Sequence, residues 1–156
     1  MKLTQKFALG ISLLAVALLA ACGESKNTTT PTTPTITHVV GCYVATLKQD
    51  KFILNITSQN GDAVSANVAF NNFEKDSSHG TLKGTFDGTI LSGTYTFQSE
   101  GVTSIRDLFF KYANGGFNLG YGPYKDSDGT LAKIPLPADI KWDMSYTYSP
   151  SDICNA

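Results

Sequence analysis

The sequence predicts an all-β domain: a single antiparallel meander of about eight strands that forms a closed or nearly closed barrel. Three observations support this prediction. From His38 onward the chain is rich in Thr, Val, Phe, Tyr and Gly and poor in Ala, Leu and Glu, a composition that favours strands. Apolar and polar residues alternate in successive runs, as in half-buried strands. Asn, Asp and Gly separate these runs, and they tolerate the positive φ angles of tight hairpins.

The first 21 residues form a separate element. Lys2 and Lys6 flank the start of an apolar run, Phe7 to Ala21. At about 15 residues the run is too short for a comfortable membrane span and suits the hydrophobic region of a signal peptide. It leads directly into Leu19-Ala20-Ala21-Cys22, which resembles the lipobox of bacterial lipoproteins. The resemblance implies a signal peptide over 1–21 and a lipid anchor on Cys22, with acyl chains such as palmitate. Two or more chains on one residue anchor a protein stably.

Residues 22–37 are predicted to form a disordered tether behind that anchor. Thr, Pro, Ser and Asn dominate this segment, and no large hydrophobic residue appears before Ile36. Such a composition buries too little apolar surface to offset the entropy of ordering. Gly23, not Asp, follows the lipobox cysteine, and by the same resemblance this favours the outer membrane. The predicted localisation is therefore the cell envelope, with the domain facing either the periplasm or the cell surface.

Residues 38–156 are predicted to form one domain. The full chain has a formal net charge of −1, and loss of Lys2 and Lys6 with the signal peptide takes it to −3, counting side chains only. Nucleic acid is therefore not an expected partner, because no basic patch is available to follow a phosphate backbone. Cys42 and Cys154 bracket the domain, and an even pair of cysteines in an exported protein predicts a disulfide. Two free buried thiols are the alternative.

The strands are read from the alternation of apolar and polar residues. In the run from Val64 to Phe70, every second residue is apolar, and Asn60-Gly61-Asp62 before it is a hairpin signal. Asp87-Gly88 and Asn114-Gly115-Gly116 are hairpin signals of the same kind. The strands are expected near 39–48, 51–59, 63–73, 80–87, 89–98, 104–113, 116–122 and 140–148.

Two segments leave the prediction open. Residues 103–110 also suit a short helix, and only the alternation of Arg106, Leu108, Phe110 and Tyr112 favours a strand. Residues 123–139 contain three prolines and are expected to form a long loop. A meander must protect its edges, and closure into a barrel does so. A two-sheet sandwich is the alternative architecture.

The predicted interior is dominated by aromatic rings, which should fill most of an eight-stranded barrel. Gly84 and Gly93 share the inward face and are expected to leave room beside Phe86 and Tyr95. At most a shallow cup is therefore expected, at one end of the barrel near Glu100, Arg106 and Tyr121. The rings predicted to point inward are Phe52, Phe70, Phe86, Tyr95, Phe97, Phe110, Phe117, Trp142, Tyr146 and Tyr148.

Glu100, Arg106 and Tyr121 are the candidate polar site. Arg106 falls in the inward alternation, and an inward Arg needs a carboxylate. Glu100, Glu74 and Asp107 are the nearby candidates in the sequence. The cluster is either an anchor for a ligand headgroup or an ion pair that fixes a turn and plugs the barrel, and the structural role is the commoner outcome.

No catalytic residue, metal site or cofactor is predicted. His38 and His79 have no second His or Cys at a spacing suited to zinc. Asp126 to Thr130 has two carboxylates but lacks the bidentate Glu of a calcium loop. The chain contains no G-x-S-x-G motif. We therefore expect a protein that is not an enzyme, with an envelope hydrolase as the least favoured alternative.

A second resemblance covers roughly residues 70–124. The segment from Phe73 to Lys111, followed by Gly120-Tyr121-Gly122, resembles uncharacterised lipoproteins of Bacteroidota-type bacteria with a small β-barrel domain. It implies a lipoprotein and transfers no catalytic residue. Two functions are therefore expected first: a barrel that binds a small amphiphile or envelope component, or a filled barrel whose loops contact or inhibit another protein.

Overall fold

The computed structural model describes residues 37–122, 125–126, 131–133 and 140–155. Seven consecutive strands form an antiparallel meander: β1 (Gly41–Leu47), β2 (Asp50–Asn60), β3 (Ala63–Asn71), β4 (Ser78–Phe86), β5 (Ile90–Ser99), β6 (Val102–Ala113) and β7 (Gly116–Tyr121). Four short strands follow: β8 (Lys125–Asp126), β9 (Leu131–Lys133), β10 (Lys141–Trp142) and β11 (Ser149–Pro150). These residues contain no helix long and apolar enough to cross a bilayer. The predicted signal peptide, Cys22 and nearly all of the tether lie outside them.

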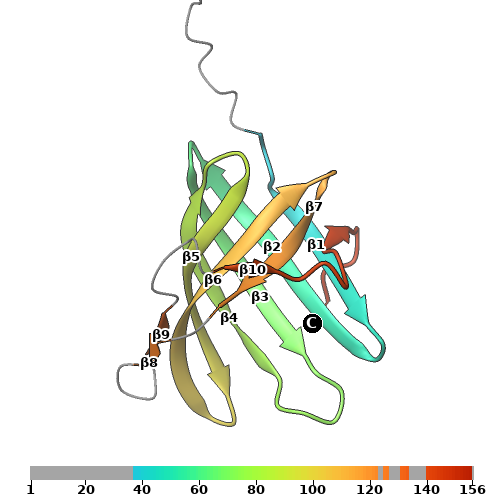
Figure 1. Ribbon diagram of the computed structural model, residues 1–156, viewed down its shortest axis with the longest axis vertical. Coiled ribbons are helices and arrows are strands. Elements are labelled where there is room, and N and C mark those ends of the chain that lie inside the picture. Colours follow the sequence, from blue (N-terminus) through green and yellow to red (C-terminus); the bar gives the residue numbers. More distant parts are fainter. Residues whose placement is uncertain (1–36, 123–124, 127–130, 134–139, 156) are drawn as a thin grey trace, which may run out of the picture. The chain divides into compact units, whose positions relative to one another are not determined.

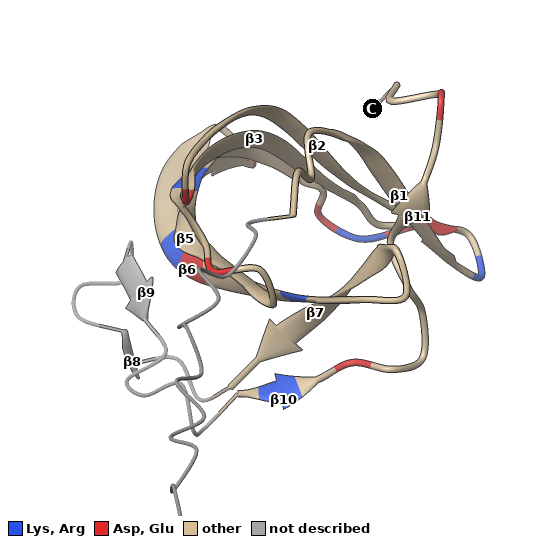
Figure 2. Ribbon diagram, turned by 90° about the horizontal axis from the view of Figure 1, so that it is seen from above, with Lys and Arg blue, Asp and Glu red and all other residues tan. Residues whose placement is uncertain are grey.

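The all-β prediction is confirmed. One sheet runs in the order β10-β7-β6-β5-β4-β3-β2-β1-β11, and it curls so strongly that its two sides approach each other (Figures 1 and 2). The segment for which a helix was the alternative is strand β6. It pairs with β5 along its length, from Ser99↔Val102 to Ile90↔Lys111. The described residues belong to one compact unit, Thr33–Ala156.

The hairpins are as short as their turn residues predict. Asn114 and Gly115 join β6 to β7, and both have positive φ, at 53° and 80°. Glu100 and Gly101 join β5 to β6 with φ of 50° and 78°. Two successive positive φ angles are the mark of a type I′ turn, whose twist matches that of the flanking strands. Such tight turns fix the register of each strand pair.

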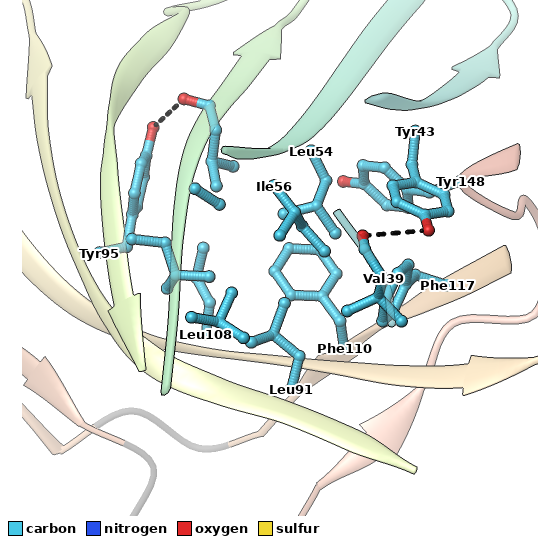
Figure 3. Close-up of a cluster of buried hydrophobic side chains, with 14 of the residues drawn as sticks. Val39, Tyr43, Leu54, Ile56, Leu91, Tyr95, Leu108, Phe110, Phe117 and Tyr148 are labelled. Carbon is cyan, nitrogen blue, oxygen red and sulfur yellow. Dashed lines mark hydrogen bonds between the residues drawn. The ribbon is translucent and has the colours of Figure 1, made fainter. Parts of the chain in front are cut away.

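The barrel has two unlike ends, which follow from the up-and-down order of its strands. The closed end is where the chain enters at Val39 and where the β2–β3, β4–β5 and β6–β7 turns lie (Figure 1). Val39 is fully buried there, its N–H donates to Gln59 Oε1 at 2.9 Å, and its carbonyl accepts from the Tyr43 hydroxyl at 3.2 Å (Figure 3). The open end carries the β1–β2 turn, the loop over 72–77 and the β5–β6 turn.

The hydrophobic core lies inside the curl, on the predicted inward face (Figure 3). Tyr95, Phe86, Phe110, Phe117 and Tyr148 are its largest fully buried side chains. Phe117 meets Tyr43 edge-on, with ring centroids 4.9 Å apart. Phe110 meets Tyr148 in the same way at 5.4 Å. Edge-to-face contacts of this kind contribute beyond the area that they bury.

The C-terminal segment closes the gap between β1 and β7. Tyr148 exchanges two backbone hydrogen bonds with Phe117 of β7, at 3.0 and 2.8 Å. The next two residues, Ser149 and Pro150, pair with Val44 and Tyr43 of β1. The predicted disulfide joins Cys42 to Cys154 just beyond this bridge, with their Cα atoms 5.7 Å apart. First and last elements are therefore neighbours, as closure requires.

The eighth strand predicted over 140–148 is wrong as a continuous element. Lys141–Trp142 pairs with β7, the chain then leaves the ladder, and it pairs with β7 again at Tyr148. The Asp143 carboxylate accepts from the backbone N–H of Ser145 at 2.9 Å and from its hydroxyl, which turns the backbone away. Trp142 is also not in the core. Its ring lies against Gly120, on the opposite face of β7 from Phe117.

Gly84 and Gly93 do not leave the expected room. They are direct cross-strand partners in β4 and β5. A Cβ on Gly93 would lie 2.6 Å from the Lys83 carbonyl oxygen, and one on Gly84 would lie 2.0 Å from that of Ser92. The backbones approach too closely here for any side chain. Glycines at such positions allow a sheet to curve sharply.

Candidate functional site

A cavity of about 400 Å³ opens at the open end of the barrel. The inward residues at the ends of the meander strands form its wall, because alternation places every second side chain on that face. The loop over 72–77 and the C-terminal segment complete it. Its lining consists of Phe52, Phe70, Asn72, Asp76, Ser78, Phe97, Ser99, Arg106, Leu119 and Tyr146.

Aromatic rings form the apolar part of the wall. Phe52 lies between Phe70 and Tyr146, with centroid distances of 5.9 and 5.1 Å. Behind them Tyr95 stacks on Phe97, with centroids 4.8 Å apart and planes 9° apart. The sequence predicts all five rings to point inward, and here they pack against each other. This half of the cavity therefore offers flat apolar surfaces.

Arg106 forms the cationic part of the wall. Its guanidinium carbon lies 4.6 Å from the centroid of the Phe97 ring. A guanidinium at that distance is attracted to the negative face of the ring, and the contact holds the cation at the cavity wall. The arrangement follows from register, because Arg106 lies opposite Tyr95 in the β5–β6 ladder and Phe97 is the next inward residue.

Hydrogen bonds fasten the loop over 72–77 to the strands around it. Asn72 donates from its side chain to the Asp76 carbonyl at 2.6 Å, and its N–H donates to the Ser77 hydroxyl at 3.2 Å. Ser99 on β5 donates to the Ser77 carbonyl at 3.1 Å. The polar rim is therefore held in place by the protein's own contacts. A preformed rim lowers the ordering cost of binding.

The tyrosines of the site keep their protons at physiological pH. Burial, the nearby Asp143 and Tyr121 raise the pKa of Tyr146 to about 12. Burial also raises the pKa of Tyr95, against smaller lowering effects from a hydrogen bond with Ser78 and from Arg106. Both hydroxyls are therefore neutral donors. The Tyr95 hydroxyl lies 3.3 Å from the Val68 carbonyl, to which it donates.

The three residues of the predicted polar cluster lie at the same end but play different parts. Arg106 lines the cavity, whereas Glu100 and Tyr121 are not among its lining residues. Glu100 occupies the β5–β6 turn and is exposed. Tyr121, at the end of β7, is 48% exposed. The side chains that share the cavity with Arg106 are instead Asp76, Ser78 and Ser99.

A larger hollow of about 460 Å³ lies elsewhere, on the outer face of β2, β3 and β4 beside Cys154. Ile53, Asn55, Asn67 and Thr81 line it, together with His79, and none of its lining residues carries an aromatic six-membered ring or a fixed charge. It therefore lacks the anchoring groups found at the barrel mouth. We place the candidate site at the mouth for that reason.

The other predicted site residues are placed as follows. Cys42 and Cys154 form a disulfide, and Cys22 lies outside the described residues. His38 and His79 are exposed and belong to opposite ends of the barrel. Within residues 37–122 and 140–155, no three His, Cys, Asp or Glu side chains converge as metal ligands.

Sequence reasoning missed part of the cavity wall. Asp76 comes from a loop without periodicity, so no pattern indicated its direction. Ser78 and Ser99 extend the inward alternation of β4 and β5 by one position each, and following the alternation to the strand ends would have found them. Comparison of the chain with protein-family models, with curated proteins and with solved structures finds no match.

Proposed function

We propose that this chain is a lipid-anchored protein of the cell envelope, held at the outer membrane, that binds a small amphiphile at the open end of its barrel without catalysing a reaction. One observation carries the proposal: a cavity of about 400 Å³ walled by aromatic rings on one side and by Arg106 and Asp76 with hydroxyl and amide groups on the other. Ligand sites are typically concave, largely apolar and supplied with a few placed polar groups.

The placement of the two ends suits an anchored binding protein. Thr37 accepts from Gln59 Nε2 at 3.2 Å, so the chain joins the barrel at the closed end. The predicted tether therefore attaches opposite the cavity, and the mouth stays accessible from the aqueous side. A lipid on Cys22 would hold the domain without covering its site.

The binding proposal is tested by blocking the cavity. Native mass spectrometry of the full chain, released from membranes, should detect a stoichiometric small molecule. Ser99→Trp places an indole in the cavity and should abolish this extra mass. Gln98→Trp is the matched control, because Gln98 is exposed on the opposite face of the same strand. Equal retention in both variants, or no bound molecule in the unchanged protein, would contradict the proposal.

The anchoring proposal has its own test. The unchanged chain should partition into detergent, and Cys22→Ser should yield an uncleaved or soluble species. A processed, fully membrane-bound Cys22→Ser protein would refute the lipid anchor.

A protein partner is the second candidate. Phe73 in the β3–β4 loop and Val102 after the β5–β6 turn are 47% and 56% exposed, and both belong to the open end. Exposed apolar side chains beside a cavity are typical of contact surfaces. The same mass spectrum distinguishes the two, because a protein partner adds the mass of a polypeptide, and Phe73→Ser would remove it while Ser99→Trp would not.

A further inference from the structure

Tyr148 carries a buried hydroxyl with no partner. The residue is fully buried, and no donor or acceptor in the described part of the chain lies within hydrogen-bonding distance of its oxygen. The other two tyrosines that are buried in the core are satisfied. Tyr43 donates to the Val39 carbonyl and Tyr95 to that of Val68 (Figure 3). Of these three buried tyrosines, Tyr148 is therefore the one whose hydroxyl has no hydrogen-bond partner among the described residues.

The Tyr148 ring lies directly behind the wall of the cavity. Its centroid is 5.9 Å from that of Tyr146 and 6.5 Å from that of Phe52, and both of these rings line the cavity. Its hydroxyl points into the barrel interior, away from the Tyr43 hydroxyl (Figure 3). Phe52 and Tyr146, whose ring centroids are 5.1 Å apart, therefore separate the cavity from Tyr148, and a ligand reaches the Tyr148 hydroxyl by moving these two rings apart.

The Tyr148 hydroxyl is available there as a hydrogen-bond donor. Burial, followed by the nearby Tyr146, Tyr95 and Asp143, raises the pKa of Tyr148 well above its usual value. The group therefore keeps its proton. A buried hydroxyl without a partner is costly, and each such group in a native protein calls for an explanation. A bound acceptor would remove this cost.

We infer that the ligand of the barrel cavity carries a neutral acceptor oxygen, such as a ketone, ester or amide carbonyl, at its leading end, and that this oxygen accepts a hydrogen bond from Tyr148. The inference rests on the proposed binding function. A neutral oxygen fits because Phe52, Phe110 and Tyr146 surround the Tyr148 ring, and a carboxylate would lose its hydration among them. Arg106 lies in the outer part of the wall and is left for the polar end of the amphiphile.

Two probes of nearly equal shape test this inference. 2-Acetylnaphthalene carries a ketone oxygen, and 2-ethylnaphthalene lacks it. The Kd of each is measured by calorimetry on the full chain with its disulfide intact. We expect the ketone to bind roughly 2- to 12-fold more tightly, as one hydrogen bond provides. Tyr148→Phe should remove this preference while still binding both probes.

Tyr43→Phe is the matched control. It also removes one buried hydroxyl, but one that already has an acceptor in Val39. It should lower the Tm and keep the preference for the ketone, whereas Tyr148→Phe should leave the Tm of the unliganded protein unchanged or higher.

Three experimental results would contradict the inference, and each would do so for a different reason. Equal affinity for both probes in the unchanged protein would overturn the role of Tyr148 and leave the binding function standing. Binding of neither probe would overturn the cavity as a site for apolar molecules and the inference with it. A Tyr148→Phe protein whose Tm falls as much as that of Tyr43→Phe would show that an internal water already accepts the bond, which would also overturn the inference.

Discussion

The closed and open ends of the barrel belong to the same meander, yet their inward positions are filled differently. At the closed end Val39, Tyr43, Phe110 and Phe117 are at most 7% exposed. At the open end Phe70 and Tyr146 are only half-buried, and Ser78, Ser99 and Arg106 occupy inward positions that elsewhere hold apolar side chains. Strands β1 to β6 continue through both ends, whereas β7 ends at Tyr121.

The difference shows where the cavity comes from. At the mouth β5 and β6 stay paired to Ser99↔Val102, whereas β7 pairs with β6 only over Phe109–Ala113. Smaller and polar side chains at the last inward positions leave the volume unfilled. A short change of composition at the strand ends therefore contributes to opening a cavity in an otherwise filled core.

Removing the Cys42–Cys154 disulfide should lower the stability of the domain more than any other change, because this bond joins β1 to the C-terminal segment that closes the barrel. The bond joins residues 112 positions apart. Loss of a cross-link of that span should lower the free energy of unfolding by about 4–5 kcal/mol in the chain-entropy model. Urea denaturation of the Cys42→Ser, Cys154→Ser double variant measures this. An unchanged midpoint would mean that the hydrogen bonds of Tyr148, Ser149 and Pro150 close the barrel alone.

A pair of Phe→Ala substitutions compares the two ends directly. Phe110 is fully buried at 0% exposure, and Phe110→Ala should cost about 3–5 kcal/mol through lost burial and the cavity left behind. Phe70 borders space that is already open, so Phe70→Ala should cost about half as much or less. The two proteins are compared by thermal and urea unfolding. Equal losses would show that the open end is as tightly packed as the closed end.

Asn118 tests how the C-terminal segment forms part of the open end. Its side-chain amide donates to the carbonyls of Asp143 and Tyr146, at 3.2 and 2.9 Å, and to the Thr147 hydroxyl at 3.1 Å. Asn118→Asp keeps the shape but replaces the donor with an acceptor, which should cost about 1–3 kcal/mol.

Asn67→Asp is the control for Asn118, because Asn67 is exposed on the outer face of β3. It should change the unfolding free energy by less than about 0.5 kcal/mol. Hydrogen exchange should show protection lost around Tyr146 in the Asn118 variant only. Full protection there would contradict the assigned role.

The smallest effect is expected from the alkaline titration of Tyr146. Its pKa is about 12 in the folded protein, against the usual tyrosine value of about 10. Below pH 10 Tyr146 keeps its proton in both the folded and the unfolded state, so its contribution to the free energy of unfolding does not change with pH. As the pH rises from 10 towards 12, the unfolded state loses a proton that the folded state retains, and stability falls. Tyr146→Phe should flatten this decline. Unfolding free energies measured from about pH 9 to pH 11 check it, and identical slopes would refute the shift.

The sequence predicts the meander well because its signals are local and consistent. The alternation of apolar and polar residues around Phe52, Phe86 and Phe110 identifies the buried face of each strand. The Asn114-Gly115 pair locates the turn between two strands. The same reasoning gives a wrong prediction for the C-terminal segment. Residues 140–148 alternate as regularly as any strand, but the Asp143 carboxylate competes for the backbone, and that outcome depends on Asn118, more than twenty residues earlier.

The candidate site was only partly accessible from sequence. Arg106 is found because it interrupts an apolar alternation with a charge. Its distance from Phe97 and its separation from Glu100 depend on how the β5–β6 turn directs its side chains, which periodicity does not encode. The close approach of Gly84 and Gly93 is likewise a property of the curvature of the whole sheet. Reading glycine as free space therefore failed for a physical reason.

The Cys42–Cys154 bond also determines how the domain would respond to mechanical force. A pull on the chain ahead of Val39 reaches Cys42 three residues later, and the disulfide passes the load at once to the C-terminal segment. β1 then cannot peel from β2 one residue at a time, because both ends of the covalent ring must move together. Forced unfolding would have to shear two elements simultaneously, which slows it. A force applied at the N-terminal end of this domain would therefore move the barrel as a whole before it separated the strands.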